Sequence, residues 1–146
     1  IGTDGAASNN RLDMLGEMRL AALLAKGVSG NPAALPAAQA LEMATLSGAR
    51  ALGLEQEIGS LEPGKQADIV AINLAYPGSL PCYDPLSDLV YSVGREQVSH
   101  VWVGGQLRVE NGICLSLDSR EILRAAGRWK GLISREGYRD SETHHA

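Results

Sequence analysis

The sequence predicts an α/β fold with a short strand end, two helices, a β region containing a hairpin, and a terminal helix. Apolar residues recur at helical spacing up to residue 53, and from Glu57 onward β-branched runs separated by turn residues replace that pattern. The chain also lacks Phe, and only 4% of its residues are aromatic. Its core must therefore consist of Leu, Val, Ile and Ala, which favours closely packed helices.

Length and composition are those of a single globular domain. The chain has 146 residues, of which 45% are hydrophobic and 21% charged, with a net charge of −4. It has no Lys/Arg cluster for nucleic acid, no apolar run long enough for a bilayer and no secretory signal pattern. Cys82 and Cys114 are too few for a disulfide framework or a Cys-based zinc site. We therefore expect a cytoplasmic protein with reduced cysteines that binds neither nucleic acid nor membrane.

The N-terminal part begins with a predicted strand end over residues 1–4, followed by a helix from Leu12 to Lys26 with Asn10 as its N-cap. This helix is apolar around most of its circumference and needs contacts on several sides, which so short a chain can hardly provide alone. Its apolar residues are Leu12, Met14, Leu15, Met18, Leu20, Leu23 and Leu24.

A second helix is predicted from Pro36, a residue suited to the first helical position, to a stop at Gly53. Small residues on one stripe of this helix permit close approach of another backbone. The stripe comprises Ala37, Leu41, Ala44, Gly48 and Ala51.

The β region follows. Pro63 and Gly64 suit the central positions of a turn, and "ADIVAINL" is a β-branched run that is mostly apolar on both faces. "VSHVWVGGQLRVENG" predicts a hairpin, because Gly104 and Gly105 supply the positive φ angles that a two-residue turn needs.

A terminal helix is predicted after Asp118, which forms a near capping box with Glu121. We expect one face of this helix to pack back onto the body, and the polar tail "DSETHHA" to be frayed. That face consists of Ile122, Ala126, Trp129 and Ile133.

Few side chains are candidates for chemistry. His100 lies in the predicted hairpin and His144 and His145 in the tail, and none has a His partner at the spacing of a metal site on an ordered element. We interpret His100 as structural and the tail pair as solvated. The chain has no nucleophile elbow, zincin motif or phosphate loop.

Asp4 has two interpretations. By residue type alone, an aspartate in this context is more often a turn or capping residue. However, an aspartate that directly follows a strand lies where barrel enzymes keep their catalytic groups. The loop "GAASNN" behind it contains nothing bulky, so a substrate could approach closely.

The residues around Asp4 resemble the last barrel strand and following helix of the amidohydrolase superfamily. The likeness is greatest to the 5-methylthioadenosine/S-adenosylhomocysteine deaminases, in the branch that also holds triazine chlorohydrolases, and it covers nearly the whole chain. It is carried by "IGTDGAASNNRLDMLGEMRLAALL", "ALPAAQALEMATLSGARALGL", "IGSLEPGKQADIVAINL", "YDPLSDLVYSV" and "VSHVWVGGQLRVENG".

The resemblance implies the C-terminal part of a (β/α)8 metal-dependent hydrolase barrel plus part of a composite β-sandwich. Asp4 matches the strand-eight aspartate, which contacts one divalent metal, usually zinc, and takes a proton from its water. Zinc can lower the pKa of bound water from about 15.7 to about 7, so a nearby carboxylate can pass the proton to a leaving amine. Gly5, Ser8 and Asn9 match the loop behind the aspartate and are expected to shape the substrate pocket.

The superfamily's histidine ligands and its acid/base glutamate do not occur in this sequence, so the chain is expected to be an incomplete portion that is inactive alone. Residues 1–53 would supply the last strand and closing helices of the barrel. Residues 54–117 would supply sandwich, and residues 118–146 a C-terminal helix and tail. The implied partners are a small purine nucleoside and the remainder of the same chain, and homo-oligomerisation is left open.

We therefore expect a hydrolytic deaminase of adenosine-type substrates, namely 5-methylthioadenosine, S-adenosylhomocysteine or adenosine. One alternative is a guanine deaminase or triazine chlorohydrolase of the same superfamily, because the discriminating residues would lie upstream. An alternative of another class is a non-catalytic β-sandwich module used for assembly. A carboxylate at the end of a buried strand is costly to bury without a role, which favours the enzyme.

Overall fold

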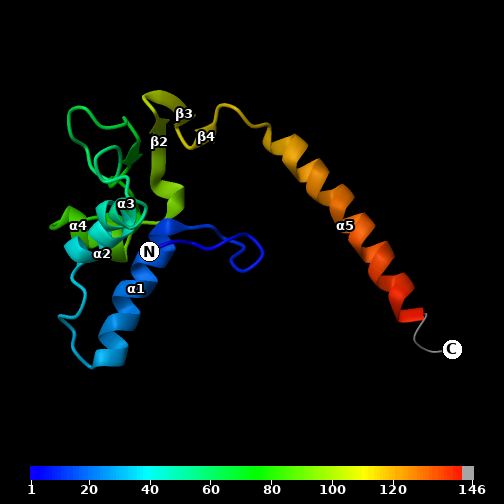
Figure 1. The fold of residues 1–146 in the computed structure, drawn as a ribbon, viewed down its shortest axis with the longest axis horizontal. Helices are drawn as coiled ribbons and strands as arrows, with labels where there is room; N and C mark the ends of the chain where they lie inside the picture. Colours follow the sequence, from blue (N-terminus) through cyan, green and yellow to red (C-terminus); the bar gives the residue numbers. More distant parts are fainter. Residues whose placement is uncertain (143–146) are drawn as a thin grey trace. The chain divides into compact units, whose positions relative to one another are not determined.

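The computed structural model describes residues 1–142 and divides the chain into two units, Ile1–Ile113 and a second unit that begins at Cys114. Figure 1 shows the elements of each unit in chain order. The helices are α1 (Met14–Ser29), α2 (Ala37–Ala44), α3 (Leu46–Ala51), α4 (Pro85–Tyr91) and α5 (Ser119–Glu142), with 3-10 turns η1 (Pro77–Ser79) and η2 (Arg95–Gln97). The strands are β1 (Ile69–Ile72), β2 (Val98–Val103), β3 (Gln106–Glu110) and β4 (Ile113–Cys114).

The start of the chain differs from the sequence prediction. Residues 1–4 do not form a strand, because no strand of the described chain pairs with them. The N-terminal ammonium of Ile1 donates instead to the carbonyl of Met43, at 3.1 Å. The N-cap of α1 is Asp13 and not Asn10, and its carboxylate accepts from the amide of Gly16 at 3.1 Å. Leu12 cannot be helical because its φ is 46°, in the left-handed region.

The second predicted helix is two helices. Thr45, at φ −126° and ψ −96°, ends α2 and precedes α3, and its hydroxyl donates to the carbonyl of Leu41 at 2.7 Å. Pro36 is the N-cap of α2 and not its first helical residue. The predicted stop at Gly53 is confirmed: its φ is 71°, and its amide bonds the carbonyl of Arg50 at 3.1 Å.

The β region forms a sheet in the order β1-β2-β3-β4 within the described chain, and β2 pairs antiparallel with both β1 and β3. The predicted hairpin is confirmed, since Gly104 and Gly105 connect β2 to β3 with φ angles of 55° and 75°. The predicted turn at Pro63 and Gly64 is also confirmed: Gly64 has a φ of 94°, and the amide of Lys65 bonds back to the carbonyl of Glu62 at 3.2 Å.

A helix that we did not predict, α4, lies between β1 and β2. Asp84 caps it by accepting from the amide of Leu86 at 3.0 Å, and Pro85 occupies its first turn. Arg19 of α1 braces the end of α4 by donating to the carbonyls of Val90, at 3.1 Å, and Val93, at 2.6 Å.

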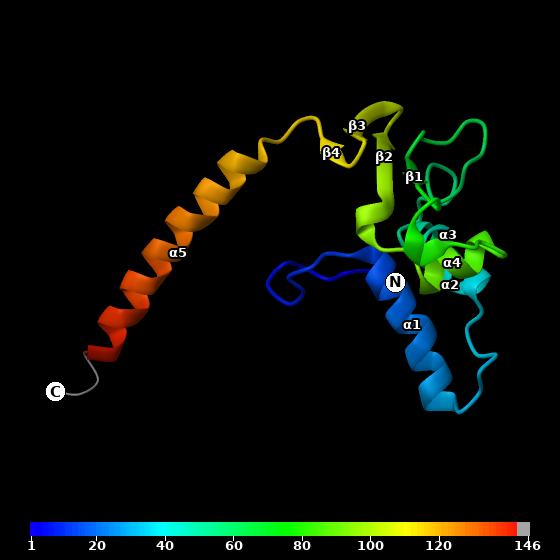
Figure 2. The ribbon, with the colours of Figure 1, turned by 180° about the vertical axis from the view of Figure 1, so that it is seen from behind.

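The core of the first unit lies where α1, α2 and α4 meet, and Figures 1 and 2 show these helices together from opposite sides. The centre of this core is aliphatic, as the lack of Phe indicated, but it also includes a methionine that we did not expect: its residues are Met18, Ala22, Ala40 and Val90. Three residues of the predicted stripe, Ala37, Leu41 and Ala44, pack against this centre. The stripe does not extend across the break at Thr45, and Ala51 is exposed.

The second unit contains α5. Its predicted start is confirmed, because the carboxylate of Asp118 accepts from the amide of Arg120 at 2.8 Å. The helix continues to Glu142 and so includes the first three residues of the tail, whereas His144 and His145 lie outside the described residues. Ile122 and Trp129 are 50% and 65% exposed, and packing of this face onto the body stays a prediction. Within residues 1–142, no helix combines the length and the apolar character that a membrane span requires.

Candidate active site

Asp4 lies in the loop that connects the N-terminus to α1. Figures 1 and 2 both show this loop projecting from the start of α1, and residues 4–8 are exposed. The φ angle of Asp4 is 59°, in the left-handed region that aspartate tolerates better than most residues because its short side chain can bond locally. The backbone turn therefore presents the carboxylate to solvent at the edge of the first unit.

The loop holds the Asp4 carboxylate in its ionised form. The amide of Gly5 donates to Asp4 Oδ1 at 2.7 Å. This N–H and, to a smaller extent, the Ser8 side chain lower the pKa of Asp4 below its ordinary value. An ionised, accessible carboxylate can take a proton from water or bind a cation.

The loop also closes on itself. The amides of Ser8 and Asn9 both donate to the carbonyl of Gly5, at 3.0 Å each. The structure thus brings Asp4, Gly5 and Ser8 together in one closed loop. Asn9 is turned differently: its Nδ2 donates to Glu17 Oε1 at 2.6 Å. Its role as a pocket residue, like those of Gly5 and Ser8, stays a prediction.

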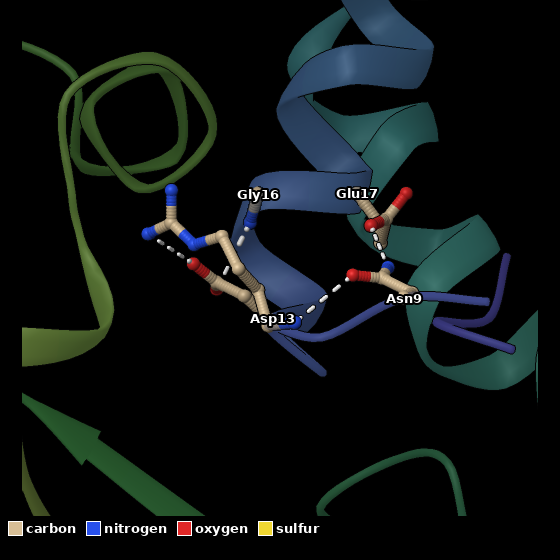
Figure 3. Close-up of a pocket in the computed structure, with 5 residues that line it drawn as sticks. Asn9, Asp13, Gly16 and Glu17 are labelled. Carbon is tan, nitrogen blue, oxygen red and sulfur yellow. Dashed lines mark hydrogen bonds and ion pairs between the residues drawn. The ribbon is translucent and has the colours of Figure 1, made fainter. Parts of the chain in front are cut away.

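Next to Asn9, a polar pocket lies at the start of α1. Figure 3 shows the side chains of Asn9 and Glu17 meeting beside the Asp13 cap. Asn9 Oδ1 accepts from the amide of Arg11 at 3.1 Å, and Arg11 Nη2 pairs with Asp13 Oδ2 at 3.3 Å. Sequence reasoning missed Arg11, Asp13 and Glu17. Asp13 was detectable as an aspartate directly before an apolar helical run, whereas the link between Asn9 and Glu17 spans eight residues of mixed conformation and leaves no local signature.

The other candidate side chains have structural surroundings. His100 in β2 is half-buried and stacks on Trp102, with ring centroids 5.6 Å apart and an interplanar angle of 14°. Cys82 and Cys114 are both free thiols and half-buried. Asp88 raises the pKa of Cys82 through its side chain, whereas the backbone of Ser116 lowers the pKa of Cys114.

Asp4 can serve as one ligand of a divalent cation, since it is exposed and ionised. Among residues 1–142, no three His, Cys, Asp or Glu side chains gather as a metal site would require. The described residues therefore fit the contribution of a single carboxylate to such a site. Further ligands would have to come from outside them.

Most of the chain is similar to known proteins. The profile of the Amidohydrolase family matches residues 1–108. A 5-methylthioadenosine/S-adenosylhomocysteine deaminase from Moorella thermoacetica is 52% identical over 122 residues, which are 84% of this chain and 28% of that protein.

Solved structures share the fold. An adenosine deaminase from Xanthomonas campestris with bound zinc superposes with a TM-score of 0.89 at 45% identity, over 92% of this chain and 31% of that one. An atrazine chlorohydrolase from Arthrobacter aurescens complexed with zinc superposes with a TM-score of 0.77 at 33% identity, over 85% of this chain and 28% of that one. The chain thus spans less than a third of the length of these proteins, and the predicted α/β fold class is confirmed. Because the family profile covers most of the sequence, the chain belongs to the amidohydrolase family, as the resemblance indicated.

Proposed function

We propose that this chain is the C-terminal portion of a metal-dependent hydrolytic deaminase of adenosine-type substrates. The observation that carries the proposal is the ionised carboxylate of Asp4 in a loop of small residues, in a chain similar to a 5-methylthioadenosine/S-adenosylhomocysteine deaminase. In this proposal residues 1–53 complete a barrel, residues 54–117 contribute to a β-sandwich, and residues 118–146 form a C-terminal helix and tail. A cytoplasmic location belongs to the same proposal.

Asp4 acts in this proposal as the group that moves the proton. The amide of Gly5 holds Oδ1 and fixes the orientation of the carboxylate, and the Ser8 side chain helps to keep it ionised. The carboxylate takes a proton from the attacking water and returns it to the amine that leaves the purine ring. Gly5 and Ser8 leave room for the substrate because neither carries a bulky side chain.

A bound divalent cation, zinc as in the two solved relatives, would add Lewis-acid chemistry that makes water more acidic. Asp4 is the described residue that would ligate it.

Substitution of Asp4 by Asn tests this function in the full-length protein that carries this chain. The amide side chain keeps the size of the carboxylate but cannot accept a proton, so kcat for deamination should fall by about 10²- to 10⁴-fold. Steady-state kinetics with 5-methylthioadenosine measure the loss. The control is Glu110→Gln, which removes an exposed carboxylate of β3 and should leave kcat unchanged.

The same measurement separates the enzyme from a non-catalytic assembly module. If Asp4→Asn deaminates as fast as the unmodified protein, Asp4 is not catalytic and the assembly interpretation gains. If neither protein acts on any substrate, the deaminase proposal fails.

A panel of substrates separates the reactions within the family. 5-Methylthioadenosine, S-adenosylhomocysteine and adenosine represent the proposed class, and guanine and atrazine the alternatives. The atrazine chlorohydrolase among the structural relatives keeps dechlorination as a second candidate. We expect the highest kcat/KM for an adenosine-type substrate, and a higher value for guanine or atrazine would replace the proposal by that alternative.

A further inference from the structure

We propose that Glu17 is a positioning residue for the loop that carries Asp4, and that it acts through the side chain of Asn9. The inference rests on the proposed function for its effect on catalysis, but its structural part can be tested independently. Nothing in the comparisons assigns a role to Glu17.

The loop cannot hold its own position by packing. Residues 5–8 are glycine, two alanines and serine, all exposed, so they bury almost no apolar surface. The backbone bonds from Ser8 and Asn9 to the carbonyl of Gly5 close the loop but join it only to itself. A carboxylate that must meet a substrate needs a connection from this loop to a rigid element, because a misplacement of about 1 Å can cost about 100-fold in rate.

Asn9 provides that connection. It is half-buried, whereas the five residues before it are exposed. Its amide is engaged at both ends: Nδ2 donates to Glu17 Oε1 at 2.6 Å, and Oδ1 accepts from the amide of Arg11 at 3.1 Å. The first of these bonds is short and has a carboxylate oxygen as its acceptor. The Asn9 side chain is thus bonded to α1 through Glu17 and to the loop through the backbone amide of Arg11 (Figure 3).

Glu17 belongs to a well-anchored part of α1. It follows the Asp13 cap by one turn, and its amide donates to the carbonyl of Asp13 at 3.0 Å. The next residue, Met18, is 1% exposed in the core that α1 shares with α2 and α4. The side chain of Glu17 therefore connects the rigid core to the closing residue of the Asp4 loop.

A simpler role for Glu17 is electrostatic. A carboxylate in the first turn of a helix stabilises the positive end of the helix dipole without any contact to a loop. Glutamine separates the two roles, since it loses the charge but keeps an oxygen that can accept from Asn9 Nδ2. Alanine loses both.

The test compares Glu17→Ala, Glu17→Gln and Asn9→Ala in the full-length protein that carries this chain. Hydrogen–deuterium exchange of the amides of Ser8 and Asn9 reports on the loop, and thermal unfolding reports on the fold. Glu17→Ala and Asn9→Ala should each speed this exchange by about tenfold, because the loop loses its strongest bond to α1. In the double variant of Glu17→Ala and Asn9→Ala, these amides should exchange no faster than in either single variant, since both substitutions remove the same contact. In Glu17→Gln, the amides of Ser8 and Asn9 should exchange at nearly the same rate as in the unmodified protein.

Kinetics supply the second readout. We expect Glu17→Ala to lower kcat by about 10- to 100-fold with a smaller change in KM, because the loop positions a catalytic group more than it binds substrate. The matched control is Glu42→Ala, which removes another helical glutamate in an exposed pair with Arg50, at 2.7 Å. This control should change neither the exchange of the loop nor kcat.

Two outcomes would overturn the inference. Unchanged exchange of Ser8 and Asn9 in Glu17→Ala would show that the contact does not hold the loop. Equal effects of Glu17→Gln and Glu17→Ala would show that the charge matters and the hydrogen bond does not. If the unmodified protein shows no deaminase activity, the proposed function fails, and the exchange data alone decide whether Glu17 positions the loop.

Discussion

At the scale of the residue, Gly59 shows how one position fixes the junction between the helical and β parts of the first unit. Its φ is 91°, and a Cβ placed there would lie 2.8 Å from Cβ of Ala49 and 3.0 Å from Cα of Leu46. Only glycine satisfies both the backbone conformation and the close approach to α3. The chain can therefore turn from α3 into the β region without moving the helix.

Substitution of Gly59 by Ala should accordingly destabilise the protein. The strain of a positive φ and the clash of the new Cβ with α3 both destabilise the variant, and we expect a loss of about 2–4 kcal/mol in the free energy of unfolding. Chemical denaturation of the full-length protein measures it. Gly78→Ala is the control, because a Cβ there meets no atom within 4 Å, and it should change stability by less than about 0.5 kcal/mol. A Gly59→Ala variant as stable as this control would mean that α3 can shift to accommodate the added Cβ at little cost in free energy.

Single residues also show where sequence reasoning succeeds and where it stops. Asp4 was identifiable by the small residues that follow it and by its match to a family motif, and the structure gives it an ionised, accessible carboxylate. Its left-handed φ was not predictable, because the preceding strand was expected to continue to it. The contact between Asn9 and Glu17 was equally hidden, since side-chain pairs follow from sequence only where a regular spacing brings them together.

At the scale of the element, the start of α1 depends on which of several capping residues the chain uses. Asn10 and Asp13 both have suitable side chains, and only the backbone decides between them. Leu12 adopts a φ of 46°, which excludes it from the helix, and Asp13 is the cap. A left-handed leucine is unfavourable by about 1–2 kcal/mol, so no propensity rule would have placed it there.

Replacement of the two candidate caps tests this assignment. Asp13→Ala should cost about 1 kcal/mol of unfolding free energy, because the amide of Gly16 loses its acceptor. Asn10→Ala should cost less than about 0.5 kcal/mol, as expected of an exposed loop residue. Urea denaturation of the two variants side by side gives the comparison. Equal losses, or a larger loss for Asn10, would return the cap to the position that the sequence suggested.

Whether the other elements could be predicted depends on how close together in the sequence the residues that determine them lie. The hairpin at Gly104 and Gly105 was predictable because the turn chemistry resides in two adjacent residues. The break at Thr45 was not, since an apolar stripe continued across it and tertiary packing decided the outcome. The short helix α4 was missed although Asp84 and Pro85 are an ordinary start signal, because its seven residues give little periodicity.

At the scale of the whole molecule, the exposed apolar surface of α1 supports the proposal that this chain is a portion of a longer enzyme. The sequence indicated a helix that needs contacts on several sides. The structure buries Met18 and Ala22 but leaves Leu20, Leu24 and Val28 exposed by 58%, 59% and 81%. The relatives that share this fold are more than three times as long as the matched region. On the proposed function, we infer that this exposed side of α1 is covered in the full-length protein.

This inference predicts that one substitution acts differently in two contexts. Leu24→Gln should change the unfolding free energy of the 146-residue chain by less than about 0.5 kcal/mol, because the side chain is already in water. In the full-length protein the same change should cost about 1.5–3 kcal/mol, the value of burying a leucine. Met18→Ala, at a site 1% exposed, should cost about 2–5 kcal/mol in both contexts and controls for the method. An equally small effect of Leu24→Gln in both proteins would show that this side of α1 faces solvent in the enzyme, and the proposed position of the helix within a barrel would then be wrong.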